Sequence, residues 1–338
     1  MKKSAMIIIL AAVVTALFYY RADIFTGKGA IIKRTRFMMD TLCTIQVPNE
    51  SGASKTEAAI NRAFDRMAEV DRKFNCTNPE SPIYQFNNAR VPITDPEIVG
   101  VVSQALDVSR ETDGAYDITV QPLVDLWGFF TTSVSSQAHT VPSPESIKRA
   151  LSHIGWRRVH VKNGVVTADK DVRIDLGGIA KGYVIGEAEK VLKASGVKSA
   201  LILAGGQVQV FGSAAPGVPW KVGVRNPRKE GYIAGLGFDS ENGVSTAGDY
   251  ERFFEVNGVR YHHIMDPKTG YPARDVMSVT VIAPDPTFAD GLDTALFVMG
   301  QKRALEFVKK RPGFKIVIVN AKGEIVTSQE AAGRTKAR

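Results

Sequence analysis

The order of helical and strand-like segments is the feature that most constrains how this 338-residue chain can fold. Apolar side chains recur at helical spacing in five segments, which predicts helices at 54–75, 96–112, 179–195, 288–300 and 301–311. Short runs rich in β-branched residues predict strands at 41–47, 158–168, 171–176, 200–204, 207–212, 219–225, 233–238, 252–256, 276–283 and 314–319. Strands and helices do not alternate regularly, so the pattern predicts a single large α+β domain rather than a doubly wound parallel sheet.

The N-terminal 21 residues have the pattern of an export signal. Lys2 and Lys3 precede sixteen residues without charge, from Ala5 to Tyr20, and Arg21 follows. No small-residue cleavage site is evident, and the aromatic end of the apolar run suits a membrane interface. We predict an exported protein, anchored in the inner membrane and facing the periplasm or another extracytoplasmic side; a buried N-terminal helix is the alternative. The predicted parts are a signal or anchor at 1–21, a linker at 22–35, the folded domain at 36–328 and a polar tail at 329–338.

Charge and cysteine content exclude some functions. The net charge of +8 is modest for this length, and no basic run is interleaved with aromatic residues, so nucleic acid is not a predicted partner. Neither Cys43 nor Cys76 lies in a CxxC or a Cys/His cluster, which argues against a zinc site. Two free thiols are favoured over a disulfide, although the sequence leaves both open.

The stretch IDLGGIAKGY, residues 174–183, has the pattern of a strand, a glycine turn and a helix. Asp175 ends the strand, Gly177 and Gly178 form the turn, and Lys181 lies one turn into the helix. Exposed backbone N–H groups and a helix N-terminus attract phosphate, and the lysine adds a cation. The spacing matches neither standard nucleotide-binding loop. A tight turn with a surface lysine is an equally good interpretation from these residues alone.

The stretch TDGAYDITVQPLVDLWGF, residues 112–129, places Tyr116 and Asp117 after an Asp-Gly turn. An aromatic ring beside an acid suits a flat heterocycle with hydrogen-bonding edges. The residues alone nevertheless favour a turn that leads into a core strand.

The stretch YHHIMDPKTGYPA, residues 261–273, contains His262 and His263 before a turn-forming DPKTG segment. Histidine is the usual proton acceptor near neutral pH. Consecutive side chains on a strand point to opposite sides, so at most one of the two histidines faces a given site.

The stretch FADGLDTALFVMG, residues 288–300, is predicted to begin a helix with oxygen side chains. Asp290, Asp293 and Thr294 are spaced i, i+3 and i+4, so they share one helical face. Hard oxygen ligands suit Mg²⁺. The alternative is helix capping, because acids in a first turn stabilise a helix by ~0.5 kcal/mol each.

Taken in order, these stretches resemble the FAD:protein FMN transferase family, also called the ApbE or flavin transferase family. The resemblance covers nearly all of residues 37–320. FMMDTLCTIQV is similar to the family's M-G-T opening, with Asp40 where glycine is common, and PESPIYQFN is a more distant match. The close matches are GAYDITVQPLVDLWGF, DLGGIAKGY, STAGDY, HIMDPKTGYP and ADGLDTALFVMG.

This resemblance implies a mixed α/β, T-fold-like domain that moves FMN from FAD onto a threonine hydroxyl of an acceptor protein, releases AMP and needs Mg²⁺. FAD is then a substrate, and threonines of exported or membrane respiratory flavoprotein subunits are the expected acceptors. The implied base is His263. The implied FAD site comprises Met39, Ala115, Tyr116, Asp117, Asp175, Lys181 and Thr269. The implied metal ligands are the Gly178 carbonyl, Asp290, Asp293 and Thr294.

Two other functions remain open at this level. A Mg²⁺-dependent FAD pyrophosphatase would use water in place of the threonine and yield FMN and AMP. A non-catalytic FAD-binding protein would need neither a metal nor a base, so Asp290, Asp293, Thr294 and His263 argue against it. The sequence does not identify the acceptor protein.

Overall fold

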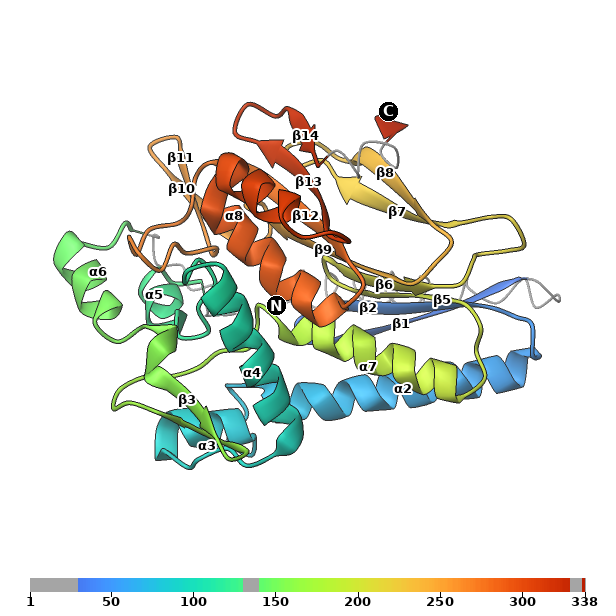
Figure 1. Cartoon of the computed structure of the whole chain (residues 1–338), viewed down its shortest axis with the longest axis horizontal. Helices are drawn as coiled ribbons and strands as arrows, with labels where there is room; N and C mark the ends of the chain where they lie inside the picture. Colours follow the sequence, from blue (N-terminus) through green and yellow to red (C-terminus); the bar gives the residue numbers. More distant parts are fainter. Residues whose placement is uncertain (1–29, 130–139, 329–335, 338) are drawn as a thin grey trace, which may run out of the picture.

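An eight-stranded antiparallel sheet organises the computed structural model, which describes residues 30–129, 140–328 and 336–337 (Figure 1). The strand order is β1-β2-β5-β6-β9-β12-β13-β14. Their bounds are Ile31–Met38, Thr41–Pro48, Ala200–Ala204, Gln207–Phe211, Asn242–Gly248, Val276–Ala283, Lys315–Asn320 and Ile325–Thr327. The predicted α+β class is confirmed.

Three long helices cover one face of this sheet: α2 (Ala53–Phe74), α7 (Ala180–Ala194) and α8 (Pro286–Lys309). α7 packs between α2 and α8, and α8 lies against β9 and β12. Strand alternation supplies the apolar contacts, since Val279, Val281 and Ala283 of β12 point into the helical core. The helical face is therefore the main core of the domain.

A smaller sheet covers the other face. It consists of β7 (Trp220–Arg225), β8 (Tyr232–Phe238) and the short β15 (Lys336–Ala337). Val208 of β6, Val244 of β9 and Ile282 of β12 point to this side and form a second core with β7 and β8. The central strands are thus buried on both faces, and alternate residues of each strand enter different cores.

The remaining elements form the end of the molecule that lies beside the N-terminus of α7 (Figure 1). The helical elements are α3 (Pro82–Ala89), α4 (Pro96–Glu111), α5 (Gln121–Leu126), α6 (Pro144–Leu151) and the 3₁₀ turn Trp156–Arg158. Two hairpins accompany them, β3 (Val159–Lys162) with β4 (Val165–Ala168), and β10 (Phe253–Val256) with β11 (Val259–His262). Stacked rings of Trp127, Phe254 and Tyr261 join α5 to the second hairpin.

Several predicted boundaries change in the structure. β1 begins at Ile31, so any linker ends before the predicted residue 35. Residues 171–176 are not a strand, because the Asn87 side chain, rather than a neighbouring strand, bonds both backbone groups of Ile174. The strands β1, β9, β11, β14 and β15 were not predicted, nor were the helices α3, α5 and α6; α5 lies where the sequence favoured a core strand. α8 starts at Pro286 and kinks at Gly300, where φ is 77°, so the two predicted helices meet there.

Two predictions concern residues at the edges of the described structure. No helix within residues 30–129, 140–328 and 336–337 is both long enough and apolar enough to cross a membrane. The predicted signal or anchor at 1–21 lies outside the described residues. Of the predicted polar tail, Lys336–Ala337 pairs with β8.

Cys43 and Cys76 are both free, in agreement with the favoured prediction.

Candidate active site

Two buried aspartates on α8 form the centre of the site. Asp285 caps the helix, since its side chain accepts a hydrogen bond from the Thr287 backbone N–H at 2.8 Å. Pro286 occupies the first helical position, so Asp290 and Asp293 lie in the second turn. The sequence analysis had predicted the first turn, which is wrong. Each is only 1% exposed. The capping alternative is therefore wrong for this pair, because another acid performs that role.

Hydrogen bonds from three elements hold the two carboxylates. The Gly182 backbone N–H on α7 donates to Asp290 Oδ2 at 2.8 Å. Ser245 on β9 donates to Asp293 Oδ2 at 2.6 Å, and its hydroxyl oxygen lies 3.4 Å from Asp290 Oδ1. Thr294 donates to Asp293 Oδ1 at 3.0 Å. Asp293 thus bonds to Thr294 directly and is linked to Asp290 through Ser245, in agreement with the shared helical face that the spacing predicted.

Burial and mutual repulsion disfavour the charged forms of Asp290 and Asp293, and a bound cation would offset both effects. Burial raises the pKa of Asp290, and Lys181 and hydrogen bonds offset part of that rise. Burial and the adjacent Asp290 charge raise the pKa of Asp293 well above its usual range. Within the described residues, no cluster of three or more His, Cys, Asp or Glu side chains is arranged to hold a metal. Two acids and a hydroxyl nevertheless fit a hard cation that keeps water or phosphate oxygens as further ligands.

The predicted glycine turn lies directly before α7. Asp175 accepts from the Gly177 N–H at 2.9 Å, and Lys181 Nζ donates back to the Gly177 carbonyl at 3.1 Å. Tyr116 lies beneath Gly178, where an added Cβ would be 3.1 Å from the tyrosine Cε2. Burial raises the pKa of Tyr116 well above its usual range, and the charge of Asp290 adds to the rise. The stretches 112–129, 174–183 and 288–300, which are separate in the sequence, therefore meet around the N-terminus of α7.

The segment around Tyr116 is held in place by Asp117. Its Oδ1 accepts from the backbone N–H and the hydroxyl of Thr119, at 2.8 and 2.6 Å, and its Oδ2 accepts from the Trp156 N–H at 2.9 Å. Ala115 is also buried, at 5% exposure. Asp117 therefore shapes this loop through contacts within the protein. Contact of Ala115 or Asp117 with FAD stays a prediction.

The hairpin turn between β1 and β2 explains the unusual Asp40. Met38 pairs with Thr41, so Met39 and Asp40 form a two-residue turn with φ angles of 52° and 56°. Both angles are left-handed, as in a type I′ turn, and aspartate tolerates this conformation better than most residues other than glycine. The Met39 N–H donates to Asp71 Oδ2 at 3.3 Å. Aspartate can therefore replace the glycine that is common in the family.

The two adjacent histidines have different environments. His262 is 3% exposed; its Nε2 lies 2.7 Å from the Ala273 carbonyl, and its Nδ1 accepts from the Ile264 N–H at 3.3 Å. It is a satisfied core histidine. His263 instead has a buried Nδ1 without a hydrogen-bond partner among the described residues. Burial, with His262, Arg252 and Lys181 nearby, lowers the pKa of His263 to about 3, so its ring is neutral near pH 7.

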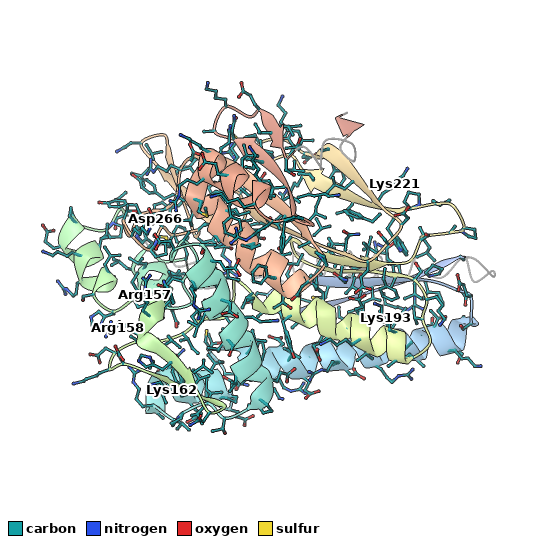
Figure 2. All side chains as sticks on the ribbon, in the orientation of Figure 1. Arg157, Arg158, Lys162, Lys193, Lys221 and Asp266 are labelled. Carbon is teal, nitrogen blue, oxygen red and sulfur yellow. The ribbon has the colours of Figure 1, made fainter. Side chains whose placement is uncertain are left out.

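Thr269 lies in an exposed turn. Its hydroxyl donates to Asp266 Oδ2 at 3.1 Å, and Trp127 Nε1 donates to the neighbouring Gly270 carbonyl at 3.0 Å. Figure 2 labels Asp266 at the end of the molecule that carries α5, α6 and the β10–β11 hairpin, whereas Lys193 lies at the far end of α7. The turn is thus anchored to the aromatic cluster, and its contact with FAD stays a prediction.

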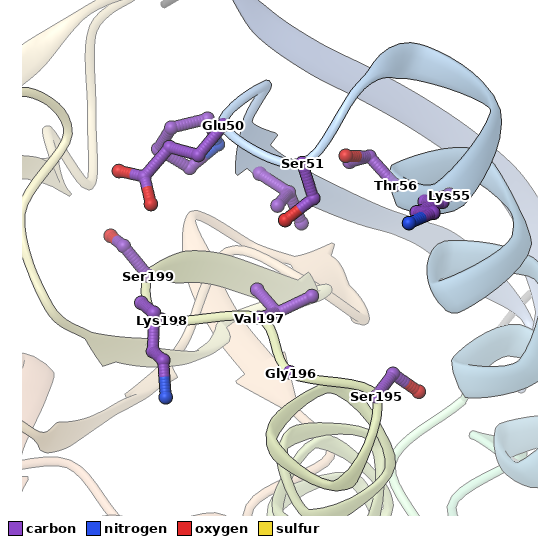
Figure 3. Close-up of a pocket in the computed structure, with 11 residues that line it drawn as sticks. Glu50, Ser51, Lys55, Thr56, Ser195, Gly196, Val197, Lys198 and Ser199 are labelled. Atoms are coloured by element: carbon purple, nitrogen blue, oxygen red, sulfur yellow. The ribbon is translucent and has the colours of Figure 1, made fainter.

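A surface pocket of about 250 Å³ lies elsewhere (Figure 3). Lys55 of α2 and Ser195, Lys198 and Ser199 after α7 line it. It lies at the C-terminal end of α7, whereas the carboxylates contact the N-terminal turn. The Ser199 hydroxyl already bonds the Ser213 carbonyl at 2.6 Å. This pocket is separate from the predicted site.

The sequence analysis missed three residues of the site. Ser245 is part of STAGDY, but no role was predicted for it because β9 itself was not predicted. Gln207 of β6 donates to the Ser245 hydroxyl at 3.2 Å, and only strand pairing brings the two together. Arg252 was also missed; its carbonyl accepts from the His263 N–H at 3.0 Å. The unusual polar content of STAGDY was the one available signal.

Fold and site together define a mixed α/β protein with a buried carboxylate pair beside a glycine turn, an arrangement suited to phosphate-bearing ligands. The chain belongs to the ApbE family, whose model matches residues 39–318. The resemblance inferred from the sequence is confirmed.

Individual relatives agree with this assignment. The chain is 31% identical over 307 residues to the FAD:protein FMN transferase of Treponema pallidum, covering 85% of this chain and 83% of that protein. It is 33% identical over 256 residues to the enzyme of the same name from Salmonella typhimurium, covering 72% of each. The crystal structure of the ApbE protein of Thermotoga maritima superposes with a TM-score of 0.83 at 35% identity, covering 91% of this chain and all of that one (100%). The flavin transferase ApbE of Vibrio cholerae gives 0.77 at 25% identity, covering 89% and 97%.

Proposed function

We propose that this chain transfers FMN from FAD to a threonine hydroxyl of an acceptor protein, with Mg²⁺ as the cofactor and AMP as the second product. Membership of the ApbE family and the names of the relatives support the transfer. The observation that carries the proposal is the buried pair Asp290 and Asp293. Asp290 accepts from the N-terminal turn of α7, and the charges of both acids raise the pKa of the buried Tyr116. Such a pair suits a cation that bridges to a pyrophosphate.

The transfer is a displacement at phosphorus. The threonine oxygen bonds to the phosphorus on the riboflavin side of FAD, and the bond from that phosphorus to the bridging oxygen breaks. The bridging oxygen leaves with AMP, and the hydroxyl proton passes to a base. When bound, Mg²⁺ would neutralise the charge that builds on the pyrophosphate. Asp290, Asp293, Thr294 and the Gly178 carbonyl would hold it.

Other residues bind and orient the substrates in this proposal. Lys181 supplies a positive charge beside the glycine turn, where a phosphate would bind. Tyr116, packed under Gly178, presents a flat wall to the site. His263 is neutral near pH 7 and its Nδ1 has no partner in the described part of the chain, so it can accept the threonine proton. A bound pyrophosphate would raise its pKa, because the negative charge offsets the repulsion from Arg252 and Lys181.

A reconstituted assay tests the function. The full chain is incubated with FAD, Mg²⁺ and an exported respiratory flavoprotein subunit, beside the same subunit with its acceptor threonine changed to valine. We expect flavin fluorescence that stays with the unaltered subunit on a denaturing gel, and one AMP for each flavin attached. Free FMN and AMP without labelled subunit would instead assign the pyrophosphatase activity. FAD that remains intact would reject both activities.

Replacement of His263 by alanine should slow transfer by ~10²-fold, the usual contribution of a positioned base. The rate should partly recover at high pH, where hydroxide can take the proton. Because the pKa of His263 is about 3 before substrate binds, protonation of this residue in the free enzyme should not slow the wild type between pH 8 and pH 5. Single-turnover rates against pH measure both effects. His160→Ala, on an exposed histidine that bonds Asp169, is the matched control. An unchanged rate in His263→Ala would leave His263 as a structural residue.

We also propose that the reaction takes place on the outer side of the inner membrane, as the basic and apolar N-terminus suggests. Protease added to intact spheroplasts should then digest the domain. Digestion only after the cells are permeabilised would place the domain in the cytoplasm instead.

A further inference from the structure

The hydroxyl of Ser245 lies between the two buried carboxylates. It is 2.6 Å from Asp293 Oδ2 and 3.4 Å from Asp290 Oδ1, and the Ser245 residue is 1% exposed. The short contact is a hydrogen bond from the serine hydroxyl to Asp293, and with a cation bound both carboxylates would be ionised and could only accept. Its single proton therefore points to the aspartates, with the shorter bond to Asp293.

Gln207 supports this direction of the serine proton by donating to the serine oxygen. Gln207 of β6 and Ser245 of β9 are directly opposed in the sheet, so their side chains share the helical face. The Gln207 amide lies 3.2 Å from the Ser245 oxygen and is 5% exposed. Since the serine proton is committed to a carboxylate, the amide nitrogen and not the amide oxygen must face the serine. The donor chain therefore runs from Gln207 through Ser245 to Asp293.

We infer that Gln207 and Ser245 are positioning residues, which hold the two carboxylates in the orientation that binds a divalent cation. The inference rests on the function proposed above. Side chains that orient metal ligands in this way commonly affect metal affinity by ~10–100-fold. Ser245 stabilises Asp293 in its charged form and holds one oxygen of each carboxylate, while the other lone pairs stay available to an ion. The rigid central strands keep this geometry from relaxing.

Direct metal binding tests the inference without relying on FMN transfer. Mn²⁺ serves as the probe, because free Mn²⁺ has a paramagnetic resonance signal that is lost on binding. The full-length wild type and Ser245→Ala are titrated with Mn²⁺, with Mg²⁺ as the competitor. Ser278→Ala is the matched control: Ser278 lies on neighbouring β12, is fully buried, and its hydroxyl has no partner among the described residues. Melting temperatures are recorded for each variant.

We expect Ser245→Ala to bind Mn²⁺ ~10–100-fold more weakly than the wild type, and Ser278→Ala to bind it equally well. Ser245→Thr, which keeps the hydroxyl, should recover most of the affinity. Equal affinity in Ser245→Ala and the wild type would overturn the inference, as would an equal loss in Ser278→Ala. A wild type that does not bind Mn²⁺ would overturn the proposed metal site itself. If Ser245→Ala does not fold, Gln207→Met removes the first donor of the chain, and unchanged affinity there would also reject the inference.

Discussion

Replacement of Asp290 by asparagine is expected to abolish Mg²⁺-dependent transfer while leaving the protein folded. Asparagine has nearly the same shape, so its side-chain oxygen can still accept the hydrogen bond from the Gly182 N–H. The substitution removes one of two adjacent buried charges that repel each other. The melting temperature should therefore stay level or rise. Activity should fall by ~10²–10³-fold, as when a preorganised charge-stabilising group is lost.

Initial transfer rates measured against Mg²⁺ concentration, beside thermal melts, check this expectation. FAD binding should weaken only in part, because Tyr116 and Lys181 are unchanged. Asp285→Asn is the matched control, since Asp285 lies at the same end of α8 but only caps the helix. It should cost at most ~1 kcal/mol of stability and leave the Mg²⁺ dependence as it is. Wild-type activity in Asp290→Asn would remove Asp290 from the metal site.

Replacement of Gly182 by alanine is expected to destabilise the whole domain and remove activity with it. A Cβ at this position would lie 2.2 Å from the Pro286 carbonyl oxygen and 2.7 Å from the Asp290 Cβ. The first of these is backbone and cannot rotate away, so α7 and α8 would have to separate. Overpacking of this kind costs ~3 kcal/mol or more. The separation would also break the hydrogen bond from the Gly182 N–H to Asp290.

Chemical denaturation of the purified variant measures the loss of stability. Gly100→Ala is the matched control: Gly100 lies inside α4, is exposed, and an added Cβ would meet no atom within 4 Å. That change should stabilise the protein by ~0.5–1 kcal/mol, because alanine is the better helix former. A Gly182→Ala variant as stable as the wild type would show that α7 and α8 do not need this close approach.

The site could be predicted from sequence wherever its residues are neighbours in the chain. Asp290, Asp293 and Thr294 share a helical face through spacing alone, and the glycine turn before α7 is visible as adjacent glycines. Strand alternation alone could not distinguish His262 from His263, although the family resemblance implied His263. Only the structure shows that His262 is bonded to the Ala273 carbonyl, while Nδ1 of His263 finds no partner among the residues that the structure describes.

Other parts of the site were beyond prediction because they depend on distant contacts. β9 was missed, although it lies at the middle of the sheet between β6 and β12. Its residues, including the glycines Gly243 and Gly248, lack the pattern of an ordinary strand. The position of Asp290 along α8 was also misjudged, because the helix begins at the Asp285 cap, before the predicted start.

The sequence by itself thus determined the α+β class, most helices and strands, and the chemical groups that the protein has for binding a cation and a phosphate. These follow from periodicity and from residues close together in the chain, which local physics governs. Only the tertiary structure decided which of those groups meet. Gly182, Ser245 and Asp290 come from three separate elements, and their hydrogen bonds exist because α7 and β9 both pack against α8. Such contacts depend on the sum of many packing interactions across the domain, and no local pattern in the chain encodes them.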